Sequence, residues 1–153
     1  MKNHIITVGG ATRDTTFFTD EGVLIDNQRD VLRQKLLAFE YGAKIKIDRF
    51  YFLFGGGAAN AAVNFAVSGF KTACLARVGQ DESGRAIIAN LRQRGVITSL
   101  VSSEKNRETM ISFILVTPGG ERIIFTSRAA PNDSRISPQE ERILKQAARL
   151  YMA

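Results

Sequence analysis

Three consecutive glycines mark a sharp turn between an apolar run and a helix pattern. The glycines of residues 55–57 follow Phe50 to Phe54 and open onto an alanine-rich stretch from about Ala58 to Ser68. Glycine lets the backbone turn sharply and lets another group approach the main chain closely. The N–H groups at a helix start attract oxygen-rich or anionic ligands, and Asn60, one turn in, can both donate and accept. The junction predicts a site for a small polar ligand.

Two glycine-terminated apolar runs stand on either side of this junction. His4 to Val8 predicts a short buried strand before a Gly-Gly pair, and Thr72 to Val78 predicts a second strand before another glycine. After the second strand, Asp81 or Ser83 can cap a helix that runs to about Arg94. Asp81 is therefore predicted to be a cap and not a site residue.

The rest of the chain contains a hairpin signal and a helix start. Thr109 to Thr117 and Arg122 to Ser127 flank a Pro-Gly-Gly-Glu turn, which predicts a β-hairpin. Ser137-Pro138-Gln139-Glu140 predicts a capping box with proline at the first helical position, and the helix is expected to end near Arg149. Leu150 to Ala153 predicts the first residues of another buried strand, so the chain looks cut. Helices that alternate with buried strands indicate an α/β layered sheet, with the hairpin as a mixed or peripheral element.

The stretch between residues 20 and 49 fits two periodicities. Val31 and Leu36 belong to a helical stripe, whereas Leu37 and Tyr41 belong to an alternating strand pattern. Periodicity leaves both alternatives open.

Composition narrows the class of protein. The chain has 153 residues, enough for one domain with a core, and a net charge of +6 without a run of five or more like charges. This dispersed charge favours anionic small molecules over nucleic acid. Cys74, the only cysteine, lies in an apolar run and predicts a buried thiol in a reducing compartment. Since no signal peptide or transmembrane stretch is present, we expect a cytoplasmic protein without membrane contact.

Several motifs occur in one consistent order. The segment GGGAANAAVNFAVSGFKTACLARVG holds Asn60, Gly69 and Gly79 and continues into GQDESGRAIIANLRQRGVITSLV, with a Gly-x-Asp-x-x-Gly pattern. The opening ITVGGATRD and the later TMISFILVTPGGERIIF complete the set. Together these segments resemble the N-terminal half of the ribokinase-like (PfkB) carbohydrate kinases. The resemblance covers nearly the whole chain except Phe17 to Asp48.

The resemblance implies a ribokinase-like three-layer α/β/α sheet, of which residues 1–153 are the N-terminal portion. Residues 17–48 then correspond to the family's lid, a small β-sheet over the substrate that often mediates dimerisation. On that ground, strands are favoured at Leu36 to Tyr41 and at Lys44 to Arg49. A homodimer through the lid is the expected partner arrangement.

The resemblance also implies a binding site for a sugar or nucleoside. Asp14, Asn60 and the backbone of Gly56 and Gly57 would hold this substrate, and Thr12, on the same loop as Asp14, would add a hydroxyl contact. A carboxylate can accept hydrogen bonds from two neighbouring hydroxyls, which suits a polyol. Gly57 stands where ribose-specific members place lysine, which argues against ribose itself.

The family's catalytic base is the aspartate of a Gly-Ala-Gly-Asp motif in the C-terminal half, followed by the ATP pocket. Nothing in this sequence matches that motif. The resemblance therefore implies that ATP and Mg2+ serve the full-length enzyme. It implies no catalytic, cofactor-binding or metal-binding residue in this chain, which would be inactive alone because phosphoryl transfer depends on positioning and charge stabilisation.

Three other readings remain. The first is a non-catalytic sugar-binding or dimerising module of the same fold. The second is a dinucleotide-binding oxidoreductase, but GGGAAN lacks the G-x-G-x-x-G spacing. Nucleic-acid binding rests on charge alone and ranks last.

Arg77 and Arg128 could reach a phosphorylated substrate, but solvated or ion-paired arginines are the expected outcome.

Overall fold

A fully parallel sheet forms the base of the structure, a computed structural model that describes residues 4–127 and 135–153. Its strand order is β10-β1-β6-β7. The strands are β1 (Ile5–Val8), β6 (Thr72–Gly79), β7 (Val101–Glu104) and β10 (Arg149–Met152). Val8 pairs with Leu75 on one side and with Met152 on the other, so β1 is an interior strand.

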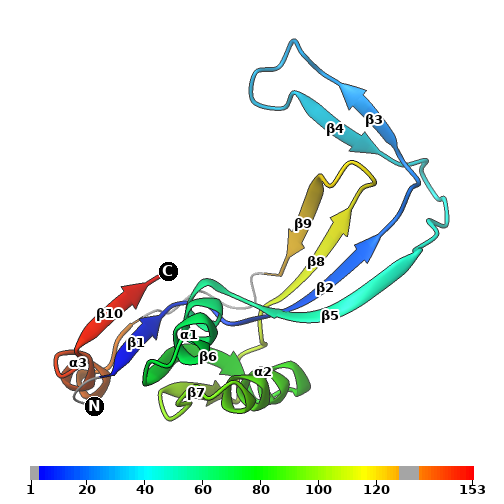
Figure 1. Cartoon of the computed structure of the whole chain (residues 1–153). Helices are drawn as coiled ribbons and strands as arrows, with labels where there is room; N and C mark the ends of the chain where they lie inside the picture. Colours follow the sequence, from blue (N-terminus) through cyan, green and yellow to red (C-terminus); the bar gives the residue numbers. More distant parts are fainter. Residues whose placement is uncertain (1–3, 128–134) are drawn as a thin grey trace.

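Helices cover both faces of this base sheet. Helices α1 (Gly57–Val67) and α2 (Glu82–Gln93) lie on one face, and α3 (Pro138–Leu144) lies on the other (Figure 1). Strand β6 shows why, because its side chains alternate between the two faces and both sets are buried. Cys74 and Val78 pack with α1 and α2, whereas Leu75 packs with Leu144 of α3. The predicted three-layer α/β/α arrangement is confirmed.

Fully buried apolar side chains hold the layers together. Ile6, Ile87 and Leu91 are each at most 1% exposed, and such burial stabilises by roughly 1.5–3 kcal/mol per side chain. Cys74 lies in this core as predicted, and burial raises the pKa of its thiol.

A second sheet extends from the base as an arm (Figure 1). Its order is β5-β2-β8-β9, formed by β2 (Thr12–Phe18), β5 (Arg49–Gly55), β8 (Ile111–Val116) and β9 (Arg122–Thr126). A separate two-stranded hairpin, β3 (Val23–Asp26) with β4 (Lys35–Ala38), continues from it. We refer to these six strands together as the lid.

The lid differs from the sequence-based expectation in two ways, whereas the hairpin β8–β9 is the mixed or peripheral element that was expected, because β8 pairs with β2 outside the base sheet. Thr12 and Asp14 were expected on a loop, but they lie on β2, which pairs along its whole length with β5. A strand at Lys44 to Arg49 was wrong: the backbone N–H of Lys46 is taken by the Glu21 side chain, and β5 begins only at Arg49.

Other predicted elements are confirmed with shifted ends. Strand β4 covers Lys35–Ala38, so only the start of the predicted Leu36 to Tyr41 strand forms. Helix α3 ends at Leu144 and not at Arg149, because the N–H of Ala148 already donates to the backbone oxygen of His4 as β10 begins. Strand β7 has weak apolar alternation and was missed. No helix among the described residues is long and apolar enough to cross a membrane.

An ion pair joins strand β6 of the base sheet to the start of α3. Arg77, on β6, donates to both carboxylate oxygens of Glu140 at 2.8 and 2.9 Å. Glu140 also completes the predicted capping box with Ser137. Hydrogen bonds from Arg77, opposed by burial and supported by Ser137, lower the pKa of Glu140 from 4.5 to about 2. The expectation that Arg77 is ion-paired is confirmed, whereas Arg128 lies outside the described residues.

Replacing Glu140 by Gln should make the free energy of unfolding depend less on pH in the acidic range. The folded-state pKa is depressed, so the pair stabilises above the unfolded pKa of 4.5, and this contribution is lost as pH falls towards 2. The loss should be on the order of 1–2 kcal/mol after screening. Urea denaturation between pH 7 and pH 2.5 measures it. Glu141→Gln, which removes an exposed pair with Lys145, is the control; identical profiles for the two variants would contradict the assignment.

Candidate functional site

The carboxyl edge of the base sheet contains a topological switch point. From β1 the chain continues to β6 on one side, and β10 later pairs on the other side of β1. In open α/β sheets, ligands bind in the crevice outside the carboxyl ends of strands at such a reversal. Gly9 follows β1 there, and Ala153 follows β10, with its N–H bonded to the oxygen of Val8.

The glycine turn enters this edge and starts α1. Gly56 has a φ of 93°, a left-handed conformation that glycine tolerates, and it caps the helix without a side-chain hydrogen bond. A Cβ on Gly56 would lie 2.6 Å from the Cα of Ala11, and one on Gly57 would lie 2.6 Å from the Cβ of Ala153. The turn is therefore packed against the residues that follow β1 and β10. The positive end of the α1 dipole faces the same edge.

Asp14 and Thr12 lie directly over the first glycine of the turn. The pairing of β2 with β5 sets Thr12 opposite Gly55 and Asp14 opposite Leu53. The Thr12 hydroxyl donates to Oδ1 of Asp14 at 2.9 Å. A Cβ on Gly55 would lie 2.7 Å from the Thr12 oxygen and would collide with Oδ2 of Asp14. The carboxylate thus rests on the bare Gly55 backbone, partly exposed, at the base of the lid.

Asn60 lies on an exposed position of α1, one turn after Gly56. It lines a groove of about 480 Å³ between β5, α1 and α2, together with Phe54 and Asn64. The structure therefore brings Thr12, Asp14 and the glycine turn together, while Asn60 stands at the neighbouring groove.

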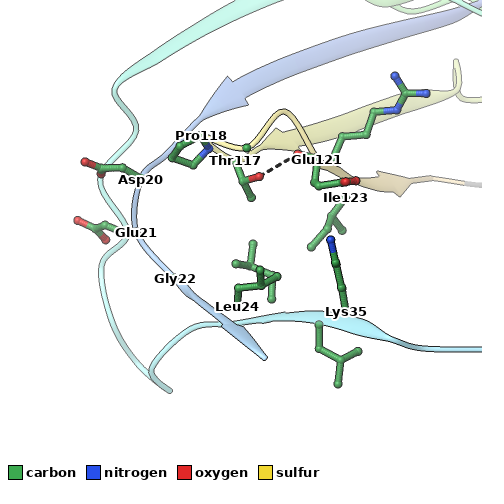
Figure 2. A pocket seen from close by; sticks show the side chains of 13 residues that line it. Asp20, Glu21, Gly22, Leu24, Lys35, Thr117, Pro118, Glu121 and Ile123 are labelled. Carbon is green, nitrogen blue, oxygen red and sulfur yellow. Dashed lines mark hydrogen bonds between the residues drawn. The ribbon is translucent and has the colours of Figure 1, made fainter. Parts of the chain in front are cut away.

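Another cavity, of about 430 Å³, lies within the lid. Leu24 and Lys35 of the β3–β4 hairpin line it opposite the β8–β9 turn, and Asp20 and Glu21 lie at its edge (Figure 2). None of the sequence-predicted site residues lines this cavity.

Sequence reasoning missed two contributors to the edge. Gly55 was predicted to be part of a sharp turn that a ligand approaches, whereas in the structure it ends β5 and leaves room for the Asp14 carboxylate. Ala153 packs against Gly9 and Gly57. This contact joins segments far apart in the chain, so no local sequence pattern indicates it. Within residues 4–127 and 135–153, no group of three or more His, Cys, Asp or Glu could hold a metal ion.

Gly55→Ala should displace the Asp14 side chain and destabilise the chain. The new methyl group meets the Thr12 and Asp14 oxygens, and such overpacking costs about 1–3 kcal/mol. Gly119→Ala, at a position with space around it, is the control and should change stability by less than about 1 kcal/mol. Thermal unfolding of both variants measures this. Equal stability of the two would show that Asp14 does not rest on Gly55.

Comparisons with known proteins identify the family. A profile of the pfkB family carbohydrate kinases matches residues 23–153. A 2-dehydro-3-deoxygluconokinase of Thermoproteus tenax is 34% identical over 88 residues, which are 56% of this chain and 27% of that protein. A mouse (Mus musculus) ribokinase is 34% identical over 83 residues, 54% of this chain and 26% of that protein. These matches span about a quarter of each relative's length.

Solved structures share the fold. Arabidopsis thaliana ribokinase, solved with ribose and ATP, aligns with a TM-score of 0.78 and 21% identity over 99% of this chain and 45% of its own. A nucleoside kinase of Methanocaldococcus jannaschii aligns with a TM-score of 0.65 and 19% identity over 98% of this chain and 51% of its own. The fold is therefore ribokinase-like. Since the profile match covers most of the sequence, the chain belongs to the pfkB family of carbohydrate kinases.

Proposed function

We propose that this chain is the acceptor-binding part of a kinase that transfers the γ-phosphoryl group of ATP to a hydroxyl of a sugar or nucleoside. The observation that carries the proposal is the Asp14 carboxylate, which rests on Gly55 beside the start of α1. A carboxylate at the switch point of an α/β sheet is well suited to accept hydrogen bonds from adjacent hydroxyls.

The groups around Asp14 have different roles in the proposed binding of the acceptor. Thr12 donates to Oδ1 of Asp14 and so restrains the carboxylate, which leaves Oδ2 towards the Gly55 backbone and the substrate side. Gly56 and Gly57 let the substrate approach the main chain at the helix start, which has no side-chain cap and offers N–H donors apart from that of Ala59, which donates to the oxygen of Gly10. Asn60, exposed one turn later, supplies an amide that reaches a ligand placed across the start of α1. The lid extends from the base beside this region (Figure 1) and, closed over a bound substrate, would limit access of water.

The named relatives support the substrate class. They include a fructokinase of Solanum tuberosum, a ribokinase solved with ribose and ATP, and a nucleoside kinase. Their acceptors are polyhydroxylated small molecules. Gly57, with no side chain, favours a sugar other than ribose in this protein, because ribose-specific members carry lysine there.

We also infer that ATP and Mg2+ act in the complete enzyme and that this chain alone is inactive. The sequence has no Gly-Ala-Gly-Asp motif, and its described residues offer no set of metal ligands. The chain's own residues bind and orient the acceptor, and no step of phosphoryl transfer is assigned to them.

A specific observation supports the dimerising function in addition. The β3–β4 hairpin has two strands only, and it carries Val23 at 66% and Leu24 at 63% exposure. An isolated two-stranded hairpin is marginal in water, and large exposed apolar patches mark interaction sites. A second copy of the lid would cover these side chains and the open edges of β5 and β9.

Thermal melts against a panel of sugars, sugar acids and nucleosides test acceptor binding. A ligand at about a hundredfold over its dissociation constant adds roughly 2.7 kcal/mol, a shift of several degrees for this size. Asp14→Asn keeps the shape but replaces an accepting oxygen by a donor, and should abolish the shift. Asp26→Asn, on the lid hairpin, should retain it. A shift that is equal in all three proteins would place the ligand elsewhere.

Light scattering of the purified chain tests dimerisation. Ile25→Lys, in β3, should convert a dimer into a monomer because a charge cannot be buried at low cost in an apolar contact. Val67→Lys is the control, since Val67 is also an exposed β-branched side chain, at 64% against 44% for Ile25, but it ends α1, away from the lid. A monomeric wild type, or dissociation by both substitutions, contradicts a lid-mediated dimer.

A further inference from the structure

Asp81 and Thr109 join the start of α2 to the chain that enters the lid. Oδ1 of Asp81 accepts from the N–H of Gly84 and from the hydroxyl of Thr109, each at 2.7 Å. Oδ2 accepts from the Thr109 N–H, also at 2.7 Å. The Thr109 hydroxyl in turn accepts from the N–H of Gly79 at 2.9 Å, and Thr109 is 4% exposed. One carboxylate therefore caps a helix and holds a distant loop.

Two glycines make room for this contact. A Cβ on Gly79 would lie 2.9 Å from the Thr109 nitrogen, and one on Gly84 would lie 3.0 Å from its hydroxyl oxygen. The first and last positions of the Gly-x-Asp-x-x-Gly segment thus admit Thr109, and the aspartate binds it. Burial alone would raise the pKa of Asp81, but the hydrogen bonds from Thr109 and Gly84 outweigh it and hold this pKa below its ordinary value.

Asp81 and Thr109 contact each other just before β8, the strand that pairs with β2, and β2 carries Asp14. Thr109 lies two residues before the first residue of β8, and the N–H of Arg13 donates to the backbone oxygen of Met110, the residue between them, at 3.0 Å. From there β8 runs parallel to β2, with Ser112 opposite Asp14. The path from α2 to Asp14 is therefore a short series of backbone pairs that starts at Thr109.

We propose that Asp81 and Thr109 are positioning residues that anchor the root of β8, and with it β2 and Asp14, to the rigid base of the fold. The consequence for acceptor binding rests on the proposed function of Asp14, whereas the anchoring itself does not. The α2 N-cap was foreseen from sequence; the link to Thr109, 28 residues away, was not.

Hydrogen–deuterium exchange of the purified chain tests the anchor. Thr109→Val keeps the volume and removes the hydroxyl, and Asp81→Ser keeps an oxygen for the Gly84 N–H while losing the reach to Thr109. In both variants, amides of residues 12–18 and 110–116 should exchange at least about tenfold faster, because hydrogen bonds to a charged group are lost where the lid begins. Exchange in α2 should change much less. Thr109→Ser should restore wild-type exchange.

Glu82→Gln is the matched control, since it removes an exposed negative charge from the same helical turn. Unchanged exchange in the lid strands of Thr109→Val and Asp81→Ser would overturn the anchor. A uniform rise across the base sheet and the lid would overturn it too, because it would indicate global destabilisation. Thr109→Val and Asp81→Ser remove different hydrogen bonds of the same contact, so one variant still tests the anchor if the other fails to fold.

The sugar that stabilises the wild type in an Asp14-dependent manner supplies the second readout. Its half-saturating concentration should rise about tenfold in Thr109→Val and return to the wild-type value in Thr109→Ser. Faster lid exchange with unchanged sugar affinity would overturn the positioning of Asp14. A wild-type chain that no sugar stabilises contradicts the proposed function, and the exchange data still decide whether the anchor exists.

Discussion

The close approach of three segments to the glycines of residues 55–57 determines how the rest of the structure is arranged. Asp14 and Thr12 rest on Gly55, the backbone at Ala11 packs on Gly56, and Ala153 packs on Gly57. Any side chain in this turn would separate the lid from the base or β10 from α1. The site therefore forms where crowding excludes all residues but glycine, and the same crowding brings a carboxylate to the start of a helix.

The base and the lid are each stabilised by a different kind of interaction. Buried apolar side chains on both faces of β6 stabilise the base, whereas the lid exposes large apolar side chains and depends on strand pairing and on polar contacts at its root. Asp81 and Thr109 are the strongest of these contacts among the described residues. A lid that is held by hydrogen bonds at its root and exposes apolar side chains elsewhere suits the proposed roles of covering a substrate and contacting a second copy.

Local sequence signals predicted the base sheet well. The Gly-terminated apolar runs gave β1 and β6, Asp81 and Ser137 marked the starts of α2 and α3, and the final apolar residues marked β10. The lid was harder, because strands such as β2 begin with a run of polar residues, without apolar alternation, and their partners lie far away in sequence. Asp14 was identified through the family resemblance. Its contact with Gly55 needs the β2–β5 register, which no single segment encodes.

Binding of an acceptor sugar beside Asp14 is the central claim, and backbone NMR of the chain during a sugar titration tests it most directly. The account predicts that amide shifts concentrate at residues 9–14 and 55–60, around the glycine turn and the end of β1. Shifts that concentrate instead around the lid cavity at Asp20 and Lys35, or a titration that moves no amide near the turn, would contradict it.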